Sequence, residues 1–368
     1  MPRFGKDRRW GIAAAGFLIL SCANQVVLEP SVLRSPKGDI VQADLTREPE
    51  LVWSYKLPAE PSAPAVLFGD ILAVPLKNRS VLFVNKNTGK KAGGYDLSGV
   101  PAGVVFDGRE NLIIAEKSGN GELLSYSLVD GGLDWRFALN EGGEVPILRR
   151  GELDPAGTVL AVNRGGWIYA LRADDGKPIW NQQLAPLSCT PLAGDTVFYL
   201  ADFEGKLNAF ANGKIHQSHK QPSAALCLEA AGGRLFAGGG DSSVSCVSCS
   251  GGTLLWKVKA DGKVRSLAVR DSIVFFASMP GTVAACRISG GEKIWERKLE
   301  ALVNAPLATG PGAVFVSSAE GRFLALSASK GEILWERRIP GGPVGRPILE
   351  GNTLFVATSG ERLLAFRF

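Results

Sequence analysis

The sequence predicts an all-β protein, an eight-bladed β-propeller built from four-stranded antiparallel blades. Three observations predict this fold: a repeat of about 40 residues, a recurring glycine–tryptophan hairpin, and an N-terminal strand that completes the last repeat. Glycine makes up 45 of the 368 residues, about twice its usual share. Such a content is expected of a chain that turns tightly many times.

Short apolar runs recur eight times along the chain, and each is typical of a buried strand. Aligned on one position in each run, the spacings are 41, 47, 38, 38, 39, 40 and 40 residues. The aligned positions are Leu72, Ile113, Leu160, Phe198, Phe236, Phe275, Phe315 and Phe355. A period near 40 residues is the length of one propeller blade.

Each repeat then carries a hairpin in which tryptophan follows the turn glycine by four residues. The pairs are Gly131 and Trp135, Gly176 and Trp180, Gly252 and Trp256, Gly291 and Trp295, and Gly331 and Trp335. Glycine adopts the positive φ of a tight hairpin without steric cost. A small residue recurs in the strand before the turn, at Ala170, Cys246, Ala285, Ala325 and Ala365, where we expect it to let neighbouring blades approach closely. We expect each indole to seal its blade against the next one.

The eighth repeat ends at Phe368 with its third strand, so its fourth strand must come from elsewhere. The segment Leu51–Leu57 has the pattern of the fourth strand, with Trp53 in the place of the repeated tryptophan. We therefore expect residues 51–57 to pair with the C-terminal strand and to close the ring, which removes the exposed sheet edges. The propeller should span residues 51–368.

Two repeats depart from the pattern. Gly93 occupies the tryptophan place in the first repeat, and the fourth repeat has a short hairpin without tryptophan. We interpret both departures as drift of the repeat rather than as open blades or as a surface for a partner.

The N-terminus has the features of a processing segment. Arg3, Lys6, Arg8 and Arg9 precede the apolar run Gly11–Leu20, which is too short to span a bilayer as a helix. The sequence Ile19–Cys22 resembles a bacterial lipobox, which implies lipid attachment at Cys22. We expect residues 1–21 to be a signal peptide and residues 22–50 a tether with little order, so that lipid holds the protein to a membrane surface.

Charge and cysteine content exclude some classes of partner. The basic residues against Asp7 give residues 1–21 a net charge of +3, which leaves about +2 of the total +5 for the rest. A near-neutral chain without a basic run disfavours nucleic-acid binding. Five cysteines follow Cys22, and an odd number argues against a complete disulfide framework. Cys189 and Cys227 occupy similar places in successive repeats, and their pairing stays open.

The sequence offers few candidates for catalysis or metal binding. Cys246 and Cys249 have the spacing of a thiol-redox or zinc motif, but residues three apart on a strand point to opposite faces. The two histidines, His216 and His219, have no cysteine or carboxylate nearby to complete a metal site. No hydrolase elbow or phosphate-binding loop occurs. We expect a protein that is not an enzyme and has no cofactor.

The small residue, glycine turn and tryptophan resemble the PQQ-type propeller repeat, and the resemblance covers residues 51–368. Quinone-dependent dehydrogenases share this repeat, but they need inserts between blades and an adjacent cysteine pair, and both are missing here. With its lipobox and bare ring, the chain is similar to the family of the outer-membrane protein assembly factor BamB. The family's contact loop contains leucine and arginine, whereas the corresponding segment Leu184–Pro191 is short and has no arginine. The resemblance therefore assigns no partner-contact residue in this chain.

This resemblance implies a non-catalytic outer-membrane lipoprotein that faces the periplasm. It would act as a monomeric scaffold and dock the barrel-assembly subunit of the outer membrane. The alternative is an orphan propeller of the same repeat that binds a ligand or another partner in the periplasm, with a quinone-dependent oxidoreductase as a third reading.

Overall fold

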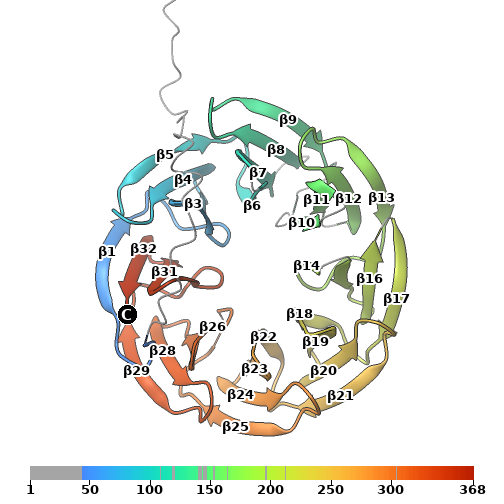
Figure 1. Cartoon of the computed structure of the whole chain (residues 1–368), viewed down its shortest axis with the longest axis vertical. Helices are drawn as coiled ribbons and strands as arrows, with labels where there is room; N and C mark the ends of the chain where they lie inside the picture. Colours follow the sequence, from blue (N-terminus) through green and yellow to red (C-terminus); the bar gives the residue numbers. More distant parts are fainter. Residues whose placement is uncertain are drawn as a thin grey trace, which may run out of the picture.

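The computed structural model describes residues 44–368, apart from 108, 118–120, 140–142, 144–146, 152–153, 164, 195–196, 212 and 304. The described residues form 32 strands and no helix. These strands make eight four-stranded antiparallel sheets arranged as the blades of one ring (Figure 1). The predicted all-β, eight-bladed propeller is therefore confirmed.

The first four blades follow the chain in order from the inner to the outer strand. Blade 1 contains β2 (Val66–Phe68), β3 (Ile71–Leu76), β4 (Ser80–Asn85) and β5 (Lys91–Asp96). Blade 2 contains β6 (Pro101–Phe106), β7 (Asn111–Glu116), β8 (Glu122–Ser127) and β9 (Leu133–Ala138). Blade 3 contains β10 (Ile147–Gly151), β11 (Asp154–Val162), β12 (Trp167–Arg172) and β13 (Pro178–Gln183). Blade 4 contains β14 (Leu192–Ala193), β15 (Phe198–Ala201), β16 (Lys206–Ala211) and β17 (Lys214–Lys220).

The remaining blades complete the ring. Blade 5 contains β18 (Ala225–Ala231), β19 (Arg234–Gly239), β20 (Ser243–Ser248) and β21 (Leu254–Lys259). Blade 6 contains β22 (Val264–Arg270), β23 (Ile273–Ser278), β24 (Thr282–Arg287) and β25 (Lys293–Lys298). Blade 7 contains β26 (Ala308–Gly310), β27 (Ala313–Ser317), β28 (Arg322–Ser327) and β29 (Ile333–Arg338). Blade 8 contains β30 (Ile348–Glu350), β31 (Thr353–Thr358), β32 (Arg362–Arg367) and β1 (Glu50–Lys56).

Blade 8 is assembled from both ends of the described chain, as the sequence predicts. Strand β1 pairs antiparallel with β32, and Trp53 lies opposite Ala365. Figure 1 shows the blue β1 lying along the outside of the red β32. This pairing gives the last blade its fourth strand and leaves no gap in the ring.

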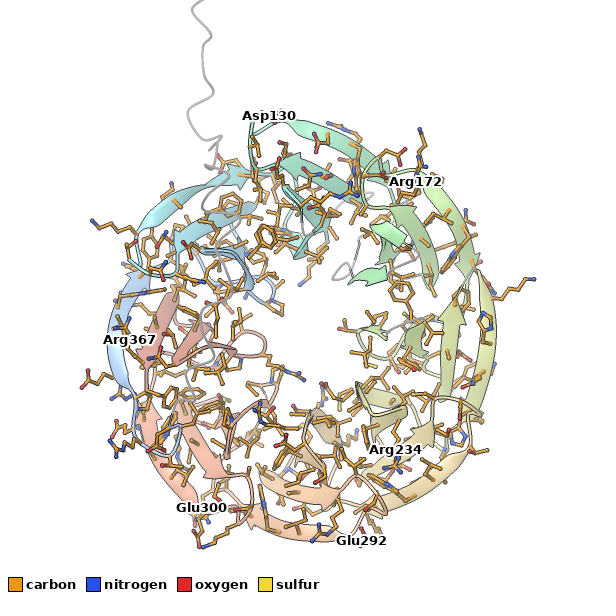
Figure 2. The ribbon with its side chains drawn as sticks, in the orientation of Figure 1. Asp130, Arg172, Arg234, Glu292, Glu300 and Arg367 are labelled. Carbon is orange, nitrogen blue, oxygen red and sulfur yellow. The ribbon has the colours of Figure 1, made fainter. Side chains whose placement is uncertain are left out.

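The hydrophobic core lies between blades rather than within one of them. One apolar cluster, for example, joins Phe275 and Trp295 of blade 6 to Val314 and Leu324 of blade 7. Charged side chains such as Asp130, Glu292 and Glu300 lie at the outer circumference (Figure 2). Stacking therefore buries the faces that each twisted sheet could not bury alone.

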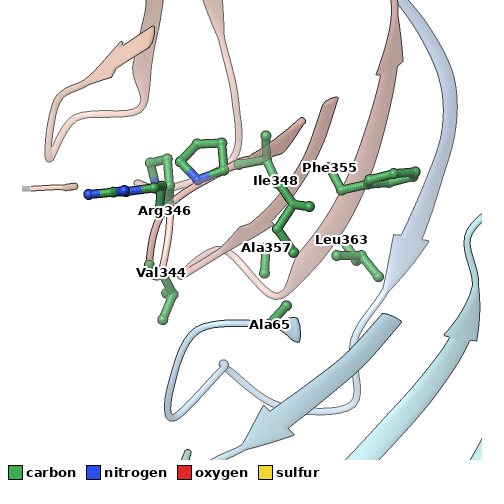
Figure 3. Close-up of a pocket in the computed structure, with 11 residues that line it drawn as sticks. Ala65, Val344, Arg346, Ile348, Phe355, Ala357 and Leu363 are labelled. Atoms are coloured by element: carbon green, nitrogen blue, oxygen red, sulfur yellow. The ribbon is translucent and has the colours of Figure 1, made fainter. Parts of the chain in front are cut away.

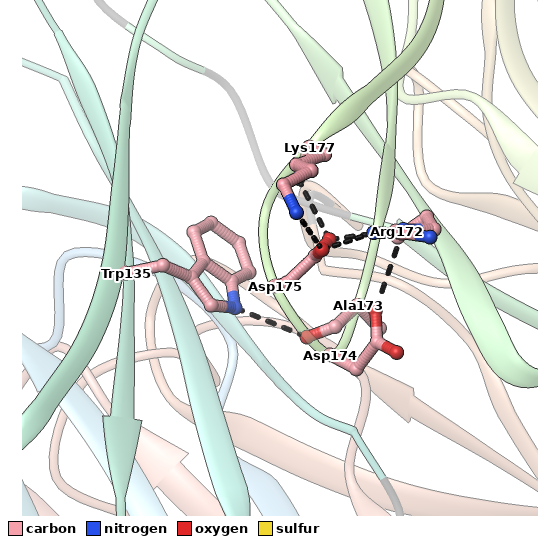
Figure 4. Close-up of polar contacts among 6 residues, drawn as sticks. All are labelled: Trp135, Arg172, Ala173, Asp174, Asp175 and Lys177. Carbon is pink, nitrogen blue, oxygen red and sulfur yellow. Dashed lines mark hydrogen bonds and ion pairs between the residues drawn. The ribbon is translucent and has the colours of Figure 1, made fainter.

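In five blades the outer-strand tryptophan forms a hydrogen bond across the boundary to the next blade. The Trp135 indole donates to the carbonyl of Ala173 at 3.2 Å and lies against the turn glycine Gly176 (Figure 4). Four further indoles make the same kind of bond at 2.9–3.1 Å, namely Trp53 to Lys86, Trp256 to Ile288, Trp295 to Ala328, and Trp335 to Leu45. The predicted sealing role of the indole is confirmed.

The small residue before the turn has a different role from the expected one. Ala285 lies directly opposite Trp295, and Ala325 lies opposite Trp335. Directly paired residues share one face of a sheet, so the small side chain makes room for the indole of its own blade.

The segment just before β1 completes the seam between blades 7 and 8. Blade 8 has no hairpin between its third and fourth strands, because both chain ends meet there. Leu45 takes the place of that hairpin: its carbonyl accepts the Trp335 indole bond, and its side chain is only 1% exposed. Glu48 adds an ion pair with Arg337 at 2.8 Å. Leu45 and Glu48, expected to belong to a tether, thus contact the propeller, whereas residues 22–43 of that tether and the expected signal peptide lie outside the described residues.

Blade 1 is closed in spite of its missing tryptophan. Gly93 lies opposite Phe83, so the large and small residues have exchanged strands. Two residues after Gly93, the Tyr95 hydroxyl donates to the carbonyl of Ser127 in blade 2 at 2.9 Å. Tyr95 therefore replaces the tryptophan bond, and the first repeat is a compensated variant rather than simple drift.

Within residues 44–368, the described part of the chain includes no helix of the length and apolarity that a membrane crossing requires.

Candidate docking site on the loop face

The connections of the blades lie at two opposite rims of the ring. Hairpins that join third to fourth strands form one rim, the hairpin face. Loops that join second to third strands, together with the connections from each blade to the next, form the other rim, the loop face. This division follows from the antiparallel order of strands in every blade.

A cavity of about 450 Å³ lies on the loop face where blade 3 meets blade 4. Its wall is made by Val162 and Asn163 at the end of β11, by the connection Pro186–Pro191, and by Phe203 after β15. This connection lies within the segment Leu184–Pro191, which the sequence singles out as the counterpart of the family's contact loop. The structure thus brings that segment together with Phe203.

Hydrogen bonds within the protein fix the polar side chains of this wall. Asn163 donates from its amide to the carbonyl of Leu139 at 3.1 Å and accepts the Trp167 amide bond at 2.9 Å. The Ser188 hydroxyl donates to the carbonyl of Ala225 at 2.6 Å. These bonds brace the cavity against blades 2 and 5, so its shape is set before any ligand arrives.

Phe203 is the most prominent apolar side chain beside the cavity, with 66% of its surface exposed. Its backbone amide donates to the carbonyl of Pro186 at 3.1 Å, which attaches the loop to the wall. Buried Asp202 accepts the Lys206 amide bond at 2.8 Å and shapes the turn. An exposed aromatic side chain beside a cavity with a mixed polar and apolar wall is typical of a protein-binding surface.

Sequence reasoning did not single out Phe203. The available signal was an aromatic residue between Asp202 and Glu204, in a loop that follows an apolar strand. A large apolar side chain among acids at a loop tip has no core to enter, so it is a candidate for binding.

The thiol in the cavity wall is a poor nucleophile. Burial raises the pKa of Cys189 to about 12, so the thiolate is scarce at neutral pH. No carboxylate, histidine or lysine belongs to the cavity wall formed by described residues.

Cys189 and Cys227 do not form a disulfide. The Ser188 hydroxyl bonds the carbonyl of Ala225, which lies 37 residues on, and the Cys227 thiol bonds the carbonyl of Val264 at the same separation of 37. Ser188, the residue before Cys189, and Cys227 therefore make the same kind of bond to the next blade. A β-bulge in β18 between Ala225 and Cys227 interrupts the regular pairing there, and a count along the sequence does not reveal it.

The other candidates from the sequence are dispersed. Cys246 packs in the cluster of Phe236 and Trp256, whereas Cys249 packs against the cluster on the other side of blade 5, so their opposed directions are confirmed. His216 and His219 lie on the outer strand β17. The described residues include no group of three or more histidine, cysteine or acidic side chains that could hold a metal ion. Cys22 lies outside the described residues.

A second cavity, of about 250 Å³, lies beside β5 of blade 1. Gly93 and Gly94 leave it open where other blades have larger side chains, and Ser80, Lys91 and Asp96 give it polar walls. It has no exposed aromatic side chain comparable to Phe203, so the cavity between blades 3 and 4 is the stronger candidate for docking.

Comparison with known proteins agrees with this architecture. The structure of BamB from Moraxella catarrhalis has a TM-score of 0.71 and 18% identity, and the match covers 87% of this chain and 100% of that one. The computationally designed Ika8 protein has a TM-score of 0.72 and 15% identity, with 85% of this chain and 98% of that one covered. Sqt1 from Saccharomyces cerevisiae has a TM-score of 0.72 and 14% identity, with coverage of 88% and 100%. At these identities, the likeness establishes the fold alone.

Sequence comparison identifies the family. No curated protein matches the chain. A family model described as outer membrane protein assembly factor BamB matches residues 36–190 and 279–367, about two thirds of the chain. The unmatched part between them holds β14 to β23, which includes Phe203 and blade 4, one of the two blades without a hairpin tryptophan. With its eight closed blades and PQQ-like hairpins, the chain belongs to the family of the outer membrane protein assembly factor BamB.

Proposed function

We propose that this protein is a non-catalytic scaffold of the cell envelope, held at the outer membrane by lipid on Cys22 and facing the periplasm. There it docks other subunits for the assembly of outer-membrane β-barrel proteins, including the barrel-forming subunit itself. Membership of the BamB family is the observation that carries this proposal.

The loop face between blades 3 and 4 offers a suitable docking surface. Phe203 projects beside a cavity in whose wall the side chains of Asn163 and Ser188 already have protein partners. A partner that inserts an apolar side chain there would bury surface without breaking these two bonds, and aromatic anchors such as Phe203 dominate binding energy. Because the wall contains no charged side chain among the described residues, salt should weaken the contact only slightly.

The same features support a role without catalysis. The thiol of Cys189 is protonated at neutral pH, and no base belongs to the described cavity wall. A bound quinone in the absorbance spectrum of the purified protein would instead favour the oxidoreductase alternative.

Photo-crosslinking tests the docking surface in cells. A photoreactive amino acid placed at Phe203 should crosslink to the barrel-forming subunit of the outer membrane. The same group at Ile215, which is exposed on the outer strand β17, serves as the control and should give no such product. Equal crosslinking from both positions, or none from Phe203, would contradict docking at this face.

Lipid attachment is tested separately. A Cys22→Ser variant should lose the incorporation of labelled fatty acid and move from the membrane to the soluble fraction. If the variant keeps its label, Cys22 is not the attachment site.

The cavity itself favours one alternative, a propeller that binds a small ligand in the periplasm. Its volume of about 450 Å³ lies within the range of small-molecule sites. Native mass spectrometry of protein purified from the envelope would detect such a ligand as a fixed added mass. A Phe203→Ala variant should lose that mass if the cavity holds the ligand.

A further inference from the structure

One arginine connects blades that are not neighbours in the ring. Arg346 lies in the connection between β29 and β30, and its guanidinium donates to both carboxylate oxygens of Glu229 at 2.9 and 3.2 Å. It also donates to the carbonyl of Leu267 at 3.0 Å. Glu229 belongs to β18 of blade 5 and Leu267 to β22 of blade 6. The contact therefore bypasses blade 7 and runs through the interior of the ring.

The loop that carries Arg346 is fixed on its own side of the ring. The Val344 amide donates to the carbonyl of Ala357 at 2.8 Å, and the Gly342 amide donates to the Ser359 hydroxyl at 3.1 Å. Gly345 has a φ of +85°, and a Cβ there would lie 2.5 Å from Pro64 of the blade 1 entry. Figure 3 shows Arg346 extending away from the blade 8 sheet. The backbone is thus anchored, and the guanidinium is presented inward.

Glu229 stands at a position that is apolar in other blades. It pairs with Phe236 in the register of the inner two strands. The same register position is occupied by Leu67, Val105, Ala268, Ala308 and Ile348 elsewhere in the ring. A carboxylate in this row has no role in the repeat itself, and only 18% of its side chain is exposed. Arg346 supplies its counter-charge.

Blade 8 needs an inner support more than blades 5 and 6 do. Its inner strand β30 has three residues, whereas β18 and β22 have seven each. Blade 8 is also the blade whose sheet joins the two ends of the described chain. We propose that Arg346 and Glu229 form an internal tie that holds blade 8 against blades 5 and 6 and restrains opening of the ring at the seam between β1 and β32.

Hydrogen exchange on the full-length protein tests the tie. Glu229→Gln and Arg346→Met keep the size of each side chain and remove the charge pair. Each single variant should accelerate amide exchange in β1, β31 and β32 by roughly threefold to tenfold, because the seam opens more often. The double variant should be no faster than either single variant, since both remove the same interaction. Additive effects, or an unchanged seam, would overturn the proposal.

A matched ion pair within one blade provides the control. Arg322 and Glu336 of blade 7 also form a two-bond pair, at 2.7 and 2.9 Å. Arg322→Met should leave amide exchange in β1, β31 and β32 unchanged. If it accelerated that exchange as much as the Glu229 or Arg346 variants do, the proposed tie would be overturned. Reversing the charges in one protein, with Glu229→Arg and Arg346→Glu, should restore part of the lost protection. If amide exchange in the charge-reversed protein were as fast as in the single variants, the proposal would also be overturned.

Discussion

At the scale of single residues, a small residue, a tryptophan and a glycine act as one unit at several blade boundaries. The indole of Trp295 lies opposite a small partner, Ala285, and reaches the next blade to bond the carbonyl of Ala328. There it covers Gly331, which has a φ of +72°. The glycine is required twice, for its backbone conformation and because a Cβ would strike the indole ring.

These two requirements can be separated by mutation. A Cβ on Gly331 would lie 2.5 Å from the Trp295 ring, whereas a Cβ on Gly312, with a φ of +70°, would meet nothing within 4 Å. Gly312→Ala should lower the free energy of unfolding by about 1–2 kcal/mol, from backbone strain alone. Gly331→Ala should cost about 1–3 kcal/mol more, because the indole must move. Urea unfolding of the two variants measures the difference, and equal losses would show that the indole contact contributes nothing.

Buried thiols predict a loss of stability in alkali. Burial raises the pKa of Cys246 to about 11, against 9.0 for an unperturbed thiol. The folded protein keeps this proton at a pH where the unfolded chain releases it, so stability should fall as the pH rises from 9 to 11. Cys246→Ala, which restores the residue found in neighbouring blades, should make this decline shallower by up to about 1.4 kcal/mol per pH unit. Identical slopes for the two proteins would contradict the prediction.

At the scale of blades and segments, the contacts between blades are preserved even where the residues of the repeat differ. Phe83 and Gly93 exchange large and small positions, and the Tyr95 hydroxyl replaces the indole bond. In the same way, Leu45 replaces a hairpin that blade 8 cannot have. Each substitute supplies the same carbonyl bond or the same volume from a different place in the chain, because packing selects shape and donors rather than particular residues.

The Leu45 segment should therefore stabilise the whole ring. Leu45→Ala leaves a cavity among Phe315, Trp335 and Phe366 and should lower the free energy of unfolding by about 2–5 kcal/mol. The neighbouring Arg47, whose side chain is 84% exposed, serves as the control. Arg47→Ala should change stability by less than about 0.5 kcal/mol. Thermal and urea unfolding of the two variants measure these changes. If Leu45→Ala lowered stability no more than Arg47→Ala does, the segment would not stabilise the ring.

At the scale of the whole molecule, sequence periodicity predicts the fold but not the surface. The spacing of apolar runs gives the number of blades, and Trp53 identifies the closing strand, since both are features of the repeat that every blade must satisfy. Phe203, Leu45 and Arg346 have no counterparts in the other repeats, so periodicity carries no information about them. The bulge in β18 between Ala225 and Cys227 becomes visible only in the pairing of the strands.

Ring closure by two distant segments gives the last prediction. A chain that starts at Pro58 lacks Leu45 and β1, so it exposes the edge of β32 and should unfold at a lower temperature. A peptide of residues 44–57 added to this truncated chain should bind in the vacant place and raise the unfolding temperature as its concentration rises. Its Trp53 fluorescence should shift to shorter wavelength as the indole packs near Phe355. A control peptide that carries Leu45→Ala and Trp53→Ala lacks both anchoring side chains. It should leave the unfolding temperature of the truncated chain unchanged. If the truncated chain melts like the full one and ignores the peptide, the two chain ends do not support each other.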